Sequence, residues 1–210
     1  NRYLNFMENA KVKYFYNKFI QVTGNTDSGK TKFILDYIRR YQNEYRDNTV
    51  FYIDIDHDLV LGYLNKNSID LHRFFYGDSA KVLMKVLAEC PNNVNLVVVD
   101  SLPMIGRENN VEVFLQKIRC ALDTNPDLSV ICVNQYRHDI RSKDGLLIPW
   151  YNNVMNKYVD INLTIESGNI KDEIINTRRK TAIINNFTSF DNNLLSMARS
   201  ASERALFVCK

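Results

Sequence analysis

The chain is poor in the residues that mark small disulfide-linked, zinc-binding or strongly charged proteins. Its 210 residues include only 4 cysteines, 4 prolines and 7 glycines, and its 27 basic residues exceed its 24 acidic residues by 3. The cysteines are widely spaced and form no CxxC pair, which argues against a zinc site and against a disulfide scaffold. The weak positive charge permits contact with nucleic acid but does not by itself indicate it.

Long apolar segments are also missing. The sequence has no run of about 18 apolar residues and no basic segment followed by an apolar one, so we expect neither a membrane span nor a signal peptide. Cys120 and Cys132 lie in apolar stretches. We interpret them as reduced core thiols of a cytosolic or nuclear protein. The first residue is Asn1 rather than Met, so this expectation covers only residues 1–210.

Apolar residues make up 45% of the chain, which is enough for one packed domain. Four short, β-branched runs are nearly continuous rather than alternating, as in strands covered on both faces. They are Phe19–Thr23, Val50–Ile55, Val94–Asp100 and Leu128–Asn134. Segments with helical spacing of apolar residues lie between them, at Lys30–Tyr45, Ser79–Glu89 and Val111–Leu122. This alternation predicts an α/β fold with a mostly parallel sheet flanked by helices.

The last third of the chain changes character. Val159–Glu166, Thr181–Asn185 and Ala205–Cys209 are short or alternating apolar runs. We expect them to form an antiparallel C-terminal extension of the same sheet. The sequence predicts a single domain over residues 19–210, preceded by an N-terminal arm over residues 1–18. Aromatic residues in that arm either cap the core or dock on a partner; they are Tyr3, Phe6, Tyr14, Phe15 and Tyr16.

A phosphate loop is the strongest motif in the sequence. The segment has the pattern GxxxxGK[ST], between a predicted strand and an amphipathic helix, and consists of Gly24, Asn25, Thr26, Asp27, Ser28, Gly29, Lys30 and Thr31. Its glycines let backbone N–H groups approach phosphate oxygens, and the following helix points its positive end at the same anion. Lys30 would bind the β- and γ-phosphates and Thr31 would bind Mg²⁺. The motif indicates a nucleoside triphosphate with Mg²⁺ without establishing hydrolysis.

Polar side chains end three other predicted strands. Asp100 closes an apolar run in the Walker B pattern and would hold Mg²⁺, and Asp56 could deprotonate the attacking water. Asp54 is better explained as a turn or capping residue, and Asp58 and His57 as polar loop residues. Gln135, after Asn134, could sense the γ-phosphate. The carboxyl ends of parallel strands meet at one edge of a sheet, so these groups are expected to gather there.

Taken together, GNTDSGKT, VFYIDIDHD, LVVVDS and VICVNQ resemble, in this order, the core ATPase domain of RecA-type recombinases. The segment Pro149-Trp150-Tyr151 also resembles the proline-led entry to the strand after the family's second DNA-binding loop. The resemblance covers the chain from about Phe19 onward. It implies that Lys30 binds phosphate, that Thr31 and Asp100 hold magnesium, and that Gln135 senses the γ-phosphate.

The chain departs from active recombinases at several points. Asp56 stands where they usually carry a catalytic Glu, and its shorter side chain implies slow hydrolysis. The segment from Ser101 to Val111 implies a shortened first DNA-binding loop, and Tyr136–Ile148 a short second one. That second loop retains the DNA-binding candidates Arg137, His138, Arg141 and Lys143. Aromatic residues Trp150 and Tyr151 replace the family's glycine pair and could stack on bases, anchor an interface or belong to the core.

This combination is most similar to eukaryotic recombinase paralogues. The resemblance implies a nuclear, ATP-binding accessory protein of homologous-recombination DNA repair. Its partners would be the strand-exchange recombinase or another paralogue and single-stranded DNA, with no membrane involved. The alternatives are a self-assembling RecA-core motor, a nucleotide kinase, and a pseudo-ATPase used as an interaction module. In a hexameric motor, Arg178 or Arg179 could serve as an arginine finger.

Overall fold

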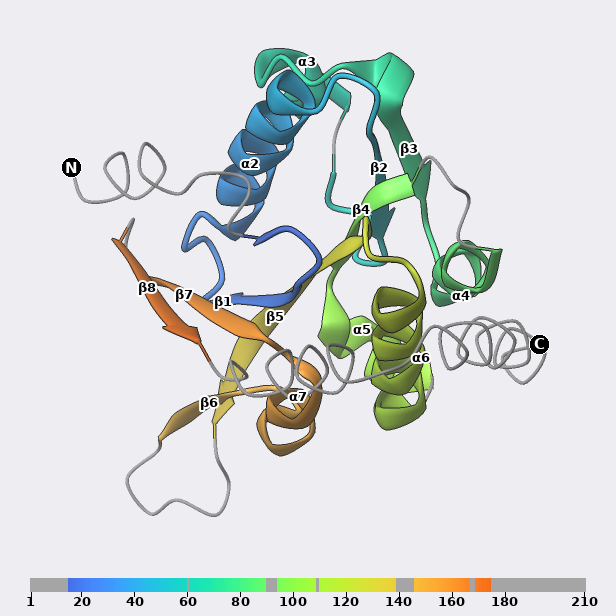
Figure 1. Cartoon of the computed structure of the whole chain (residues 1–210). Coiled ribbons are helices and arrows are strands. Elements are labelled where there is room, and N and C mark those ends of the chain that lie inside the picture. Colours follow the sequence, from blue (N-terminus) through green and yellow to red (C-terminus); the bar gives the residue numbers. More distant parts are fainter. Residues whose placement is uncertain are drawn as a thin grey trace, which may run out of the picture.

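The computed structural model describes residues 15–59, 61–89, 94–108, 110–138, 146–166 and 169–174 (Figure 1). The strands in these ranges are β1 (Phe19–Gly24), β2 (Thr49–Asp54), β3 (Phe74–Gly77), β4 (Val94–Asp100), β5 (Ser129–His138), β6 (Leu147–Pro149), β7 (Ile161–Glu166) and β8 (Asn169–Ile174). The helices are α2 (Lys30–Glu44), α3 (Leu61–Lys66), α4 (Ala80–Glu89), α5 (Leu102–Glu108), α6 (Val111–Thr124) and α7 (Asn152–Tyr158). The predicted α/β class is therefore confirmed, as are the first four strands and three helices.

The strands form one sheet in the order β3-β2-β4-β5-β1-β7-β8, and β6 pairs with β5 beside this path. All pairs from β3 through β7 are parallel, whereas β8 is antiparallel to β7 and β6 is antiparallel to β5. The chain moves from β1 toward one edge, reaches β3, and then returns across the sheet to β7. Because parallel crossovers are right-handed, these two directions of travel place their helices on opposite faces.

Two apolar clusters fill the two faces of the sheet. One joins α2 and α3 to one face of the strands, and the other joins α4, α5, α6 and α7 to the opposite face. Within β4, Leu96 and Val98 belong to the first cluster and Val97 and Val99 to the second, as the two-residue period of a strand requires. In Figure 1, α2 lies on one side of the sheet and α4, α5 and α6 lie on the other.

The prediction of an antiparallel C-terminal extension was wrong for its first strand. β7 pairs in parallel with β1, with Ile20 opposite Ile161. The physical reason is α7, a crossover helix that the sequence analysis did not predict, which returns the chain to the starting end of the sheet before β7 begins. The antiparallel strand that follows is β8, and the predicted strands Thr181–Asn185 and Ala205–Cys209 lie outside the described residues.

The two segments interpreted as short DNA-binding loops contain regular secondary structure in their described parts. The first contains helix α5, which buries Leu102 and Ile105 in the core. The second begins as a continuation of β5, so that Tyr136, Arg137 and His138 pair with β6 in an antiparallel hairpin. Of the N-terminal aromatic residues, Phe15 caps the core, with its ring centroid 5.0 Å from that of Tyr37.

No helix in the described ranges is both long enough and apolar enough to cross a membrane. Of the two described cysteines, Cys132 is buried and Cys120 is half-buried.

A buried ion pair fixes the starting ends of β1 and β7. Arg119 on α6 donates from Nη1 to Asp160 Oδ2 at 2.9 Å, and the same oxygen accepts the Phe19 backbone N–H at 2.9 Å. The side chains of Arg119 and Asp160 are only 14% and 8% exposed. Removal of one partner would leave the other charge buried without its main counter-charge, which is far more costly than loss of a surface pair.

We therefore expect Arg119→Ala to lower the free energy of unfolding by about 3 kcal/mol. Chemical denaturation monitored by circular dichroism provides the measurement. The matched control is Arg39→Ala, which removes an exposed partner of Asp36 at 3.7 Å and should cost less than about 1 kcal/mol. Equal effects of the two substitutions would show that the buried pair does not stabilise the sheet.

Candidate functional site

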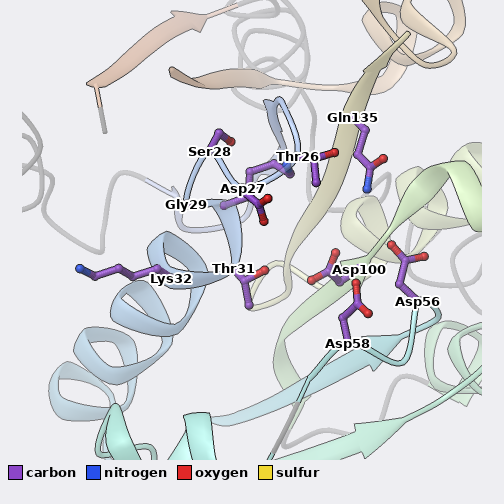
Figure 2. Close-up of a pocket in the computed structure, with 11 residues that line it drawn as sticks. Thr26, Asp27, Ser28, Gly29, Thr31, Lys32, Asp56, Asp58, Asp100 and Gln135 are labelled. Carbon is purple, nitrogen blue, oxygen red and sulfur yellow. The ribbon is translucent and has the colours of Figure 1, made fainter. Parts of the chain in front are cut away.

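A cleft of about 320 Å³ opens at the carboxyl ends of the central strands (Figure 2). The chain leaves β1 for α2 on one face of the sheet and leaves β5 for α7 on the other, so a crevice opens between these adjacent strands. The same divergence occurs between β2 and β4. The cleft is lined by Thr26, Asp27, Ser28, Gly29, Lys30, Thr31, Lys32, Asp56, Asp58, Asp100 and Gln135. It thus unites the predicted phosphate loop with the predicted strand-end acids and Gln135.

The loop between β1 and α2 depends on its two glycines. A Cβ atom on Gly24 would lie 2.4 Å from Ser28 Oγ and 2.6 Å from the Ile165 carbonyl oxygen, so a larger residue does not fit. Gly29 has a φ of +95°, in the left-handed region, and offers no side chain to cap α2. The N–H groups of the first helical turn therefore face the cleft, where an anion could accept their hydrogen bonds.

Lys30 lies under this loop and is only 8% exposed. Its ammonium donates to the Gly24 carbonyl at 3.1 Å and to the Asn25 carbonyl at 2.6 Å. Burial lowers the pKa of Lys30, and the carboxylates of Asp100, Asp27 and Asp56 act in the opposite direction. A buried ammonium with neutral carbonyl partners can transfer its hydrogen bonds to a stronger, anionic acceptor.

Thr31 and Asp100 face each other across the cleft, with Asp56 and Asp58 beside them, whereas Lys32 points away (Figure 2). Asp100 Oδ2 accepts a hydrogen bond of 2.6 Å from the fully buried hydroxyl of Tyr52. The pKa of Asp100 is raised to about 6, because burial and the nearby Asp56 and Asp54 raise it by more than the Tyr52 hydrogen bond and Lys30 lower it. A hydroxyl and a carboxylate so placed are suitable oxygen ligands for a hard divalent cation.

Asp56 is fixed by the residue that follows Asp100. Ser101, which is 1% exposed, donates from Oγ to Asp56 Oδ2 at 2.7 Å. Within the described residues, Asp56 Oδ1 is buried and has no hydrogen-bond partner. A buried acceptor without a partner costs free energy in the folded protein and is found where a ligand or water completes the site.

The neighbouring polar residues have other roles. Asp54 is buried and accepts hydrogen bonds from the backbone N–H groups of Asp58 at 3.2 Å and Leu59 at 2.9 Å, which confirms its interpretation as a turn residue. His57 is exposed, with a positive φ of 57°, and does not line the cleft. In the described part of the chain, no group of three His, Cys, Asp or Glu side chains forms a metal-binding cluster.

A second cavity of about 380 Å³ adjoins the first. It is lined by Asp56, Ser101, Pro103, Met104, Gln135, Trp150 and Tyr151, so Asp56 and Gln135 belong to both cavities. The Trp150 backbone N–H donates to the Gln135 carbonyl at 3.0 Å. The guanidinium of Arg137 lies 5.1 Å from the centre of the Trp150 ring, within the range of a cation–π contact.

The predicted DNA-binding residues are only partly accounted for. Arg137 and His138 are exposed at the end of β5, next to the second cavity. Arg141, Lys143, Arg178 and Arg179 lie outside the described residues. The aromatic pair Trp150 and Tyr151 is half-buried, with the Tyr151 ring against Gly106 of α5, so these side chains combine core packing with a cavity wall.

Sequence reasoning missed two residues that hold the acids. Tyr52 lies in the apolar run that ends at Asp54. Its hydroxyl was the only indication in the sequence that this residue has a polar partner, because a buried polar atom is costly unless it is hydrogen-bonded. Ser101 was noted only as part of a DS dipeptide. Both contacts cross between strands, so spacing along the sequence does not predict them.

Replacement of Asp100 should stabilise the ligand-free protein. The pKa of Asp100 is raised from 3.8 to about 6 on folding, so the folded protein binds this proton more tightly than the unfolded chain. The free energy of unfolding must then fall as pH rises through that range and stay lower above it. We expect Asp100→Asn to gain about 1–3 kcal/mol at pH 7.5, seen as a higher melting temperature, and to gain much less near pH 4.

The control is Asp47→Asn, which changes an exposed acid in the turn after α2 and should leave the melting temperature unchanged at both pH values. An Asp100→Asn variant that melts at or below the wild-type temperature at pH 7.5 would contradict the expected destabilisation by the ionised carboxylate.

Comparison with known proteins does not identify a family for this chain. No protein-family model matches the chain, and a search of curated proteins finds no similar sequence.

Proposed function

We propose that the chain is an ATP-binding recombinase paralogue of RecA-like fold, which assists homologous-recombination DNA repair as an accessory protein. One observation carries the proposal: the cleft combines a glycine loop, a buried lysine at the start of a helix, and Thr31 opposite the strand-end Asp100. This combination matches the chemistry of a nucleoside triphosphate with Mg²⁺.

The residues of the cleft fit such a ligand. The N–H groups at the start of α2 would bind phosphate oxygens, and Lys30 would exchange its two carbonyl acceptors for the β- and γ-phosphates. Thr31 and Asp100 would hold Mg²⁺, which supplies positive charge against the phosphate oxygens. Mg²⁺ is often bound by few protein oxygens together with phosphate and water, so the lack of a three-carboxylate cluster among the described residues agrees with this assignment.

Asp56 is the group that would accept a proton from the attacking water. Its Oδ2 is held by Ser101, and its Oδ1 has no hydrogen-bond partner among the described residues. Aspartate is one methylene shorter than glutamate, so its carboxylate would lie farther from that water, and slow turnover is expected. The Gln135 side chain, on the opposite strand end, would report the presence of the γ-phosphate.

The second cavity supports contact with single-stranded DNA. Its aromatic wall offers Trp150 and Tyr151 to a base, while Arg137 and His138 offer donors to the phosphate backbone. The hairpin of β5 and β6 brings these residues close to Gln135, which lines both cavities. A nucleotide in the first cavity and DNA in the second would therefore both contact this residue.

An accessory role in the nucleus, alongside the strand-exchange recombinase or another paralogue, follows from the resemblance noted in the sequence. Asp56 in place of a longer acid favours this role over a self-assembling, DNA-dependent RecA-core motor. The two functions differ in whether DNA accelerates ATP turnover.

Lys30→Ala should abolish ATP binding, with at least a 100-fold loss of affinity. The variant loses two charge-assisted hydrogen bonds, each worth about 1.5–3 kcal/mol, and tenfold in affinity corresponds to about 1.4 kcal/mol. Isothermal titration calorimetry with Mg²⁺·ATP measures the effect. Lys85→Ala is the matched control, since this exposed lysine of α4 does not line the cleft. Unchanged ATP affinity in Lys30→Ala would refute the phosphate-loop assignment.

Wild-type protein should hydrolyse ATP slowly, and single-stranded DNA should leave the rate unchanged. A coupled phosphate-release assay with and without an oligonucleotide measures both quantities, and Lys30→Ala defines the background. Strong stimulation by DNA would instead identify a self-sufficient motor and reject the accessory role.

A further inference from the structure

The strand register places Tyr52 next to Asp100. In the parallel pairing of β2 with β4, Tyr52 lies opposite Val98 and Asp54 lies opposite Asp100. Tyr52 and Asp100 are therefore diagonal neighbours on one face of the sheet, the face that also packs against α2. A tyrosine side chain is long enough to span that diagonal, and the hydrogen bond of 2.6 Å from its hydroxyl to Asp100 Oδ2 shows that it does.

The environment of Tyr52 fixes the direction of this hydrogen bond. The side chain is 0% exposed, and its ring lies 5.9 Å from that of Phe74 on β3. The phenol hydroxyl carries the proton of this pair and the carboxylate oxygen accepts it, so Tyr52 is the donor. The ring cannot turn away without disturbing the core, and its hydroxyl is a rigid support.

Asp54 does not provide the same support, although it lies directly opposite Asp100. Its two carboxylate oxygens accept the backbone N–H groups of Asp58 and Leu59, and Oδ2 also accepts from Tyr76. Asp54 therefore shapes the loop after β2. The backbone at the end of β4 is held separately, because the Ile55 N–H donates to the Asp100 carbonyl at 2.6 Å.

Building on the proposed function, we infer that Tyr52 is a positioning residue for Mg²⁺: its hydroxyl holds Asp100 Oδ2 and so directs Oδ1 into the cleft. The terminal torsion of an aspartate is otherwise broad, and a carboxylate free to rotate would spend less time in the orientation that binds the cation. Partners of metal ligands that fix their orientation typically contribute about 10- to 100-fold to metal affinity.

The test is Tyr52→Phe, which keeps the ring and removes the hydroxyl. ATP affinity is measured by calorimetry across a series of Mg²⁺ concentrations and again in EDTA. We expect about a tenfold loss of the affinity gained from Mg²⁺, with unchanged affinity in EDTA. A merely structural role would weaken binding in both conditions. Equal losses in both conditions, or wild-type dependence on Mg²⁺, would overturn the inference.

Tyr41→Phe is the matched control. Tyr41 is a second buried tyrosine of the same cluster, and its hydroxyl accepts from Asn48 at 2.9 Å, away from the cleft. This variant should bind ATP as the wild type does, with and without Mg²⁺. A Tyr41→Phe variant with the same Mg²⁺-specific loss would assign the effect to general loosening of the core and overturn the inference.

Should Tyr52→Phe alone melt too early for the assay, the substitution is combined with Asp100→Asn. The double variant is expected to match Asp100→Asn in its response to Mg²⁺, since the group that Tyr52 positions has been changed. A further Mg²⁺-specific loss would overturn the inference. Failure of the wild-type chain to bind ATP in a Mg²⁺-dependent manner would instead reject the proposed function itself, so the two failures are distinguishable.

Discussion

The parallel register of the central strands is the constraint on which the cleft depends. It sets Gly24 opposite Gln135 in the β1–β5 pair and Asp54 opposite Asp100 in the β2–β4 pair. Side chains that are far apart in the sequence are thus brought together at the carboxyl ends of neighbouring strands. Because side chains alternate between faces, a slip of one residue between β2 and β4 would turn Asp100 away from α2 and the phosphate loop.

This arrangement gathers several carboxylates around one cleft, and each accepts hydrogen bonds from a different kind of donor. Asp54 accepts from backbone N–H groups, Asp100 from a phenol, and Asp56 from a serine hydroxyl. Lys30 provides the nearby positive charge. Such crowding costs stability in the absence of a ligand, as functional sites commonly do. The apolar clusters on both faces and the buried Arg119–Asp160 pair offset that cost.

Local patterns were sufficient to predict the elements with strong periodicity. The continuous apolar runs identified β1, β2, β4 and β5, and the helical spacing identified α2, α4 and α6. Elements with weak patterns were missed: β3 and β6 are only 4 and 3 residues long, and α5 and α7 have 7 residues each. The direction of β7 could not be predicted, because it follows from the unrecognised crossover through α7.

The site divides in the same way. Lys30, Thr31, Asp56, Asp100 and Gln135 were predicted because each lies at or next to the end of a predicted strand or at the start of the predicted helix, and the fold brings all five to one cleft. Tyr52 and Ser101 were not predicted, because their roles arise from neighbours on other strands. Motifs therefore identified the groups that face a ligand, whereas the groups that hold them required three-dimensional structure.

The position of Trp150 has a practical consequence. It is the single tryptophan of the chain, and it lies in the wall of the second cavity with its backbone bonded to Gln135. Its carbonyl also accepts a hydrogen bond from Asn134 at 2.8 Å. Indole emission excited at the red edge of the absorption band comes from this one residue, so the unlabelled protein carries its own optical probe of whatever enters the second cavity.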